Sequence, residues 1–131
     1  MKTRSKRIIK VKTKKIANSF KYAFQGFISS FKAERNMKIH IFIMLLVIIV
    51  GIVLDINKYE WIICFFCFAL VIGGELFNTA IETVVDIITP YKNEKAKLAK
   101  DISASAVLVF AIGSSIIGLI IFVPKIVILL I

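Results

Sequence analysis

Three long apolar stretches restrict the fold of this chain more than any other feature of its sequence. They cover residues 39–54, 60–80 and 102–123. A helix of about 20 apolar residues crosses the hydrocarbon core of a bilayer. The chain is also 59% hydrophobic, with a mean hydropathy of +0.89, which exceeds the apolar share of ordinary soluble domains. The sequence therefore predicts an all-α membrane protein that forms a single domain over residues 1–131.

The second apolar stretch runs directly into a polar segment, so we expect one helix to cover both. The predicted membrane-spanning helices are then residues 39–54, 60–87 and 102–123. The connection between the first two is so short that the helices must form an antiparallel pair.

The distribution of charge predicts how these helices are oriented. Twelve of the eighteen Lys and Arg residues lie in the first 38 positions, and four more lie between the second and third apolar stretches. The positive-inside rule then places the N-terminus and the 88–101 loop in the cytoplasm and the 55–60 connection outside. Basic residues beside membrane spans favour lipid headgroups over nucleic acid as the partner.

The N-terminal region divides into two parts. Residues 1–14 form a basic arm, and residues 15–33 have the pattern of an amphipathic helix that lies in the membrane interface. Its apolar face consists of Ile16, Phe20, Phe24, Phe27 and Phe31. A helix that binds a partner protein is the alternative, but the adjacent span makes the membrane the nearer apolar surface.

A stripe of polar residues follows the second apolar stretch. At 100° per residue, Glu75, Asn78, Glu82 and Asp86 fall within roughly 80° of arc on one helix face. Ionisable side chains at membrane depth are costly unless they face a bundle interior or a wet cavity, so this stripe predicts a functional site. The alternative is a helix end whose acids pair with Lys or Arg on neighbouring helices.

The residue types of the stripe favour phosphoryl transfer. Mg²⁺ prefers one or two carboxylates together with phosphate oxygens, and the nearby Lys100 can offset phosphate charge. A deeper carboxylate such as Glu75 can accept the proton of a hydroxyl that arrives from the bilayer. The same residues would also suit a cation channel or a proton-coupled carrier, so both classes stay open. We assign no role to His40, and Glu34 could equally form a surface ion pair.

The segment from Glu75 to Asp86, ELFNTAIETVVD, is followed by Ala99-Lys100-Asp101 and then by Ala104, Ala106, Val107 and Leu108. This pattern closely resembles the prokaryotic diacylglycerol kinase family, which includes undecaprenol kinases. The resemblance covers about residues 15–122. Phe77 departs from the smaller aliphatic residue that is usual in the family.

The resemblance implies an ATP- and Mg²⁺-dependent lipid kinase in a bacterial cell membrane, a homotrimer with composite sites between subunits. Glu75 matches the proton acceptor, and Asn78 matches a residue of the catalytic polar cluster. Glu34 and Glu82 match the carboxylates that hold Mg²⁺. Nucleotide contacts are implied for Lys15, Tyr22, Glu34, Glu82, Tyr91, Lys92, Asn93, Lys100 and Asp101.

The acceptor lipid is the remaining choice. The abundance of Lys, Ile and Phe resembles family members from low-GC Gram-positive bacteria, which favours undecaprenol, giving undecaprenyl phosphate. Diacylglycerol, giving phosphatidic acid, is the alternative. An ion-conducting or transport protein built around the same stripe is the alternative from another class.

Overall fold

The computed structural model describes residues 2–131, with side chains described from residue 15 onward. All regular structure in the described residues is helical: α1 (Lys2–Ala33), α2 (Arg35–Val53), α3 (Lys58–Ile88) and α4 (Glu94–Leu130). The last three are long and apolar enough to cross a membrane. The prediction of an all-α membrane protein with three spans is therefore confirmed. The chain forms two compact units, one over α1 and the other over residues 34–131.

Helix α1 begins at Lys2, so the helix already includes positions 2–14, which we expected to form an arm before it. Met1 lies outside the described residues. On the described part of α1, the side chains of Ile16, Phe20 and Phe24 are 57%, 75% and 65% exposed. Exposed aromatic side chains at helical spacing are what an interfacial helix presents to a membrane.

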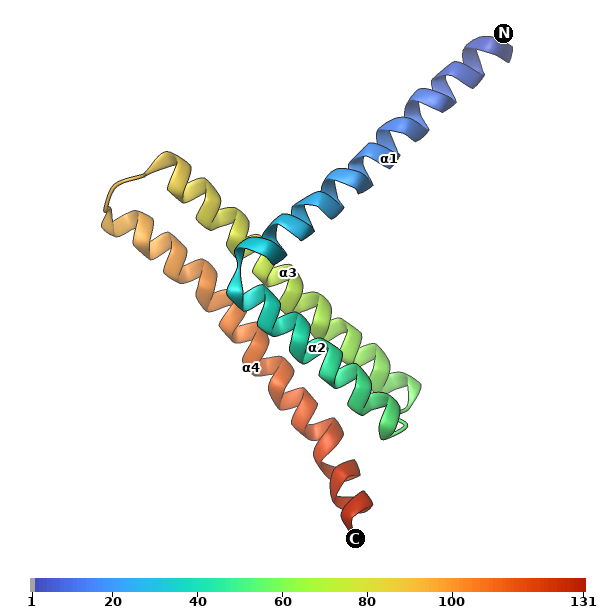
Figure 1. Cartoon of the computed structure of the whole chain (residues 1–131), viewed down its shortest axis with the longest axis vertical. Coiled ribbons are helices and arrows are strands. Elements are labelled where there is room, and N and C mark those ends of the chain that lie inside the picture. The colour runs from blue at the N-terminus through green and yellow to red at the C-terminus, as the bar shows by residue number, and fades with distance from the viewer. Residues whose placement is uncertain (1) are drawn as a thin grey trace. The chain divides into compact units, whose positions relative to one another are not determined.

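A tight connection joins α2 to α3, and the two helices run antiparallel (Figure 1). Asp55 adopts a positive φ of 47° in this turn, a conformation that Asp tolerates better than most residues. The side chain of Asn57 accepts hydrogen bonds from the N–H groups of Tyr59 and Glu60, and Glu60 Oε2 accepts one from the N–H of Asn57. This capping box fixes the start of α3.

The ends of the second connection are also defined by local chemistry. Helix α3 ends at Ile88, before Thr89 and Pro90, as the sequence predicts from the effect of proline on the residue before it. The side chain of Asn93 then accepts hydrogen bonds from the N–H groups of Lys95 and Ala96. Because Asn93 caps α4, this helix begins well before residue 102, and it continues through Pro124.

Within residues 34–131, the contact between α3 and α4 is more extensive than the contact between α2 and α3. Helices α3 and α4 lie side by side in Figure 1. Gly74 permits a close approach, since a Cβ atom there would lie 2.8 Å from Cδ2 of Phe110. This contact fixes the register of α3 against α4 at the level of the polar stripe.

The end of the bundle near the α2–α3 connection is held by an apolar cluster and an ion pair. Ile56, Cys64 and Ile121 are buried together there, and Lys125 Nζ lies 3.1 Å from Glu60 Oε2. Cys64 is buried and free, as is Cys67 one turn later. Both thiols are therefore packed inside the bundle and do not face lipid.

Candidate active site

Glu75 lies in the middle of α3 and is 2% exposed. Its Oε1 lies 3.2 Å from Nε2 of His40 on α2, whose side chain is 20% exposed. A carboxylate can only accept hydrogen bonds, so Nε2 of the imidazole donates this one. Helix α2 thus supplies a polar partner for an acid that would be costly to bury alone.

Glu75 lines a partly polar pocket of about 260 Å³ between α2, α3 and α4. The pocket is lined by Asn36, His40, Glu75, Asn78, Ala104, Val107, Leu108 and Ala111. His40 and Ala111 also line an apolar groove of about 470 Å³ that extends along the same three helices to Ile126. The two hollows therefore share His40 and Ala111 in their walls, and an apolar molecule in the groove lies next to the pocket of Glu75.

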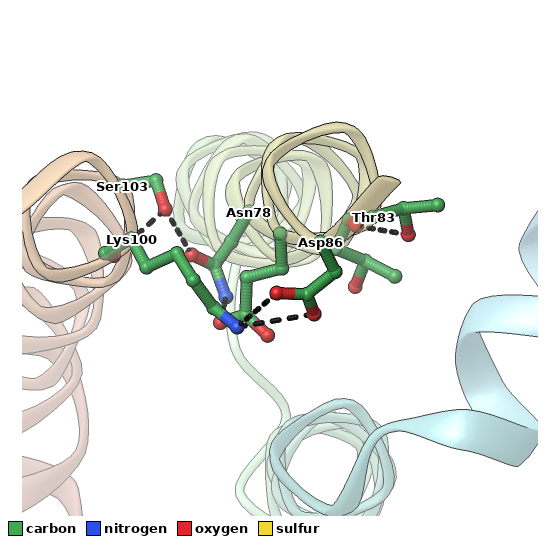
Figure 2. A network of polar contacts seen from close by, with 7 residues as sticks. Asn78, Thr83, Asp86, Lys100 and Ser103 are labelled. Atoms are coloured by element: carbon green, nitrogen blue, oxygen red, sulfur yellow. Dashed lines mark hydrogen bonds and ion pairs between the residues drawn. The ribbon is translucent and has the colours of Figure 1, made fainter. Parts of the chain in front are cut away.

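A hydrogen-bonded network continues along the stripe from Asn78 (Figure 2). The side-chain nitrogen of Asn78 donates to Glu82 Oε1 at 3.1 Å, and its oxygen accepts from Ser103 Oγ at 2.6 Å. Asn78 and Ser103 are both buried, whereas Glu82 is half-buried. Because both ends of the Asn78 amide are engaged, one oxygen of Glu82 is held in place.

Beyond this network, Lys100 reaches from α4 to Asp86 on α3 (Figure 2). Its Nζ lies 3.0 and 3.1 Å from the two carboxylate oxygens. The side chains of Lys100 and Asp86 are 33% and 64% exposed. For Asp86 the alternative interpretation of the stripe therefore holds: it is an acid at a helix end that pairs with a basic residue on a neighbouring helix.

Glu34 occupies the N-cap position of α2, where its side chain makes no capping hydrogen bond. It is half-buried and close enough to Glu75 and Lys100 to interact electrostatically with both. Among the side chains from residue 15 onward, no group of three His, Cys, Asp or Glu residues is arranged to hold a metal ion. Two carboxylates, Glu34 and Glu82, still fit Mg²⁺, since this ion takes its remaining ligands from phosphate and water.

The side chains of the other predicted nucleotide contacts are exposed. Lys15 and Tyr22 are exposed on α1, Tyr91 and Lys92 are exposed in the α3–α4 connection, and Asp101 is exposed in α4. Asn93 uses its side-chain oxygen to cap α4, so only its amide nitrogen remains for another partner. The structure thus brings Glu75, Asn78, Glu82 and Lys100 together along one α3–α4 seam.

Sequence reasoning missed two residues of this site, His40 and Ser103. His40 was assigned no role, and Ser103 was not among the predicted site residues. The position of Ser103 one turn after Lys100 was an available signal, because residues three apart share a helix face. No comparable signal existed for His40, since its contact with Glu75 joins two different helices.

The fold and the site define a multi-pass α-helical membrane protein with a buried carboxylate between a polar pocket and an apolar groove. The family model for prokaryotic diacylglycerol kinase matches residues 21–122. The chain belongs to this family, which confirms the resemblance seen in residues 75–86. It is therefore a membrane lipid kinase, with ATP as phosphoryl donor and a lipid as acceptor.

Three relatives illustrate the similarity. The undecaprenol kinase of Bacillus subtilis (strain 168) is 45% identical over 111 residues, which cover 82% of this chain and 87% of that protein. A diacylglycerol kinase of Synechocystis sp. is 39% identical over 101 residues, 76% of this chain and 58% of the relative. A diacylglycerol kinase of Haemophilus influenzae is 36% identical over 94 residues, 72% of this chain and 80% of the relative.

Proposed function

We propose that this kinase phosphorylates undecaprenol to undecaprenyl phosphate at the cytoplasmic face of a bacterial inner or plasma membrane. The identity of 45% to an undecaprenol kinase, against 39% and 36% to two diacylglycerol kinases, favours this acceptor. Diacylglycerol, which would give phosphatidic acid, is the second candidate, and the names of those two relatives support it. The observation that carries the reaction type is the buried carboxylate of Glu75 beside an apolar groove.

Glu75 is the proposed general base. The apolar tail of the acceptor lies in the groove that ends at His40, which brings its hydroxyl to the polar pocket. As the hydroxyl oxygen forms a bond to the γ-phosphorus of ATP, its proton passes to the carboxylate of Glu75. The bond between the γ-phosphorus and the β–γ bridging oxygen breaks, and ADP leaves with that electron pair. Because Glu75 is buried, water competes poorly with the alcohol.

The nucleotide is proposed to lie at the water-facing end of the stripe. Lys100 offsets charge on the phosphates, and Asn78 keeps Glu82 in position. Glu34 and Glu82 would hold Mg²⁺, which when bound neutralises charge on the phosphate oxygens. Further contacts to the nucleotide are proposed for Lys15, Tyr22, Tyr91, Lys92, Asn93 and Asp101.

Orientation and assembly are part of the same proposal. Lys92 lies in the α3–α4 connection, and Lys95 and Lys97 lie in the first turns of α4, which favours the cytoplasmic side for this end of the bundle and for the N-terminus. ATP is then available where the stripe emerges. We propose a homotrimer, because α2, α3 and α4 leave many large apolar side chains exposed to lipid or to neighbouring helices.

The test is ATP-dependent phosphorylation by the purified protein, with undecaprenol and diacylglycerol compared side by side. Labelled phosphate from the γ position of ATP should enter undecaprenol with a kcat/KM at least about tenfold higher, a difference of about 1.4 kcal/mol in transition-state binding. The reverse order would favour diacylglycerol. Label in neither lipid, together with ion flux across proteoliposomes without ATP hydrolysis, would favour the transport protein instead.

A further inference from the structure

His40 has no part in the mechanism above, although it touches the proposed base. We propose that His40 is a positioning residue that orients the carboxylate of Glu75 toward the acceptor hydroxyl. This inference rests on the proposed function, because it assigns His40 a role in the same phosphoryl transfer.

The contact itself supplies the first argument. Nε2 of His40 lies 3.2 Å from Oε1 of Glu75, and the Glu75 side chain is only 3% exposed. Water is scarce around such a group, so a donor from α2 decides which way the carboxylate faces. With one oxygen held by the imidazole, the other is the oxygen that can accept the proton of a substrate.

The location of His40 supplies the second argument. Its side chain lines both the polar pocket of Glu75 and the apolar groove. A lipid alcohol that moves from the groove to the pocket therefore passes the imidazole ring. A donor at this junction fixes the carboxylate where the hydroxyl arrives, which is the geometry that a general base requires.

Three substitutions of His40 distinguish a role in positioning Glu75 from a role in helix packing alone. Gln carries its side-chain nitrogen at a reach similar to Nε2 of His, whereas the nitrogen of Asn is one methylene shorter, and Leu has no donor. We expect kcat for the acceptor lipid to fall about 10–100-fold in His40→Leu and His40→Asn, as is typical when the orienting partner of an active group is lost. His40→Gln should recover at least about tenfold of that loss, with KM for ATP unchanged in all three.

Leu45→Met is the matched control, because Leu45 is exposed on α2 and lines neither the groove nor the pocket of Glu75. It should keep the kcat of the wild type. If His40→Leu fails to fold, the kcat values of His40→Gln and His40→Asn still test the positioning role. Equal kcat values for these two variants, or a wild-type kcat in His40→Leu, would overturn the role of His40.

A second measurement does not depend on activity. His40 is the only histidine in the sequence, so ¹⁵N NMR of histidine-labelled protein reports one imidazole. Its Nε2 resonance should shift in Glu75→Gln and stay unchanged in Glu94→Gln, since Glu94 is exposed in the first turn of α4. An unchanged resonance in Glu75→Gln would refute the contact and the proposal.

The two proposals fail in different ways. If the wild type labels neither lipid while the Nε2 resonance shifts as expected, the phosphotransferase assignment fails and His40 still positions Glu75. If the wild type labels lipid and all His40 variants turn over equally, only the His40 proposal fails.

Discussion

Ser103→Ala tests whether the Asn78 network supports the site. The substitution removes the hydroxyl that lies 2.6 Å from the side-chain oxygen of Asn78. Both residues are buried, so water cannot readily replace the lost donor. The amide of Asn78 is then fixed only through its nitrogen, which donates to Glu82.

The expected magnitude follows from this geometry. An unsatisfied buried acceptor costs about 1–3 kcal/mol in soluble proteins. Hydrogen bonds between membrane helices average about 0.6 kcal/mol and reach about 1.7 kcal/mol, because the unfolded chain in the membrane also finds partners. The bond is short and well buried, so we expect a loss of about 1 kcal/mol, a roughly fivefold change in the unfolding equilibrium. With Glu82 less firmly held, KM for Mg·ATP should rise about threefold.

The assay is SDS-induced unfolding followed through the single tryptophan, Trp61, together with steady-state kinetics in ATP. The control is Ser105→Ala, because Ser105 is exposed and its hydroxyl bonds only to the main-chain oxygen of Ile102 in its own helix. It should change stability by less than about 0.5 kcal/mol. Equal effects of the two substitutions would refute the reasoning, since burial and the Asn78 bond would then be irrelevant.

Two further substitutions, one of them with a control, test the α3–α4 seam. Gly74→Ala places a Cβ 2.8 Å from the Phe110 ring and should destabilise the protein by about 1–3 kcal/mol. Gly73→Ala meets nothing within 4 Å and should not destabilise, which SDS titration of both variants checks; equal losses would contradict the close contact. Asp86→Asn removes an exposed ion pair and frees Lys100 for phosphate. KM for ATP should therefore fall, and a raised KM would mean that Asp86 holds Lys100 in its working position.

The spans could be predicted from the sequence because apolar length alone specifies a membrane helix. The helix ends were harder to place, since they depend on short polar signals. Asn57 and Glu60 form a capping box, and Asn93 caps α4 well before the apolar stretch begins. An Asn followed three residues later by Glu is a recognisable helix start, so the first of these signals was present in the sequence and was not used.

The residues of the candidate site also fall into two groups, those that the pattern within one helix predicts and those that depend on contacts between helices. Glu75, Asn78 and Glu82 share one face of α3, and helical periodicity alone predicts this. Their partners His40 and Ser103 lie on α2 and α4, and these contacts depend on how the helices pack against each other. Gly74 and Phe110 help to set that packing, but periodicity within one helix does not give the register between two.

The most direct test of the central claim is phosphoryl transfer to undecaprenol by Glu75→Gln, measured beside ATP binding in the same preparation. Glutamine keeps the shape of the side chain but removes the carboxylate that accepts the proton. We expect nucleotide binding and folding close to those of the wild type, with turnover abolished. Turnover at the wild-type rate would contradict the account, because the buried acid between α2, α3 and α4 would then not be the base.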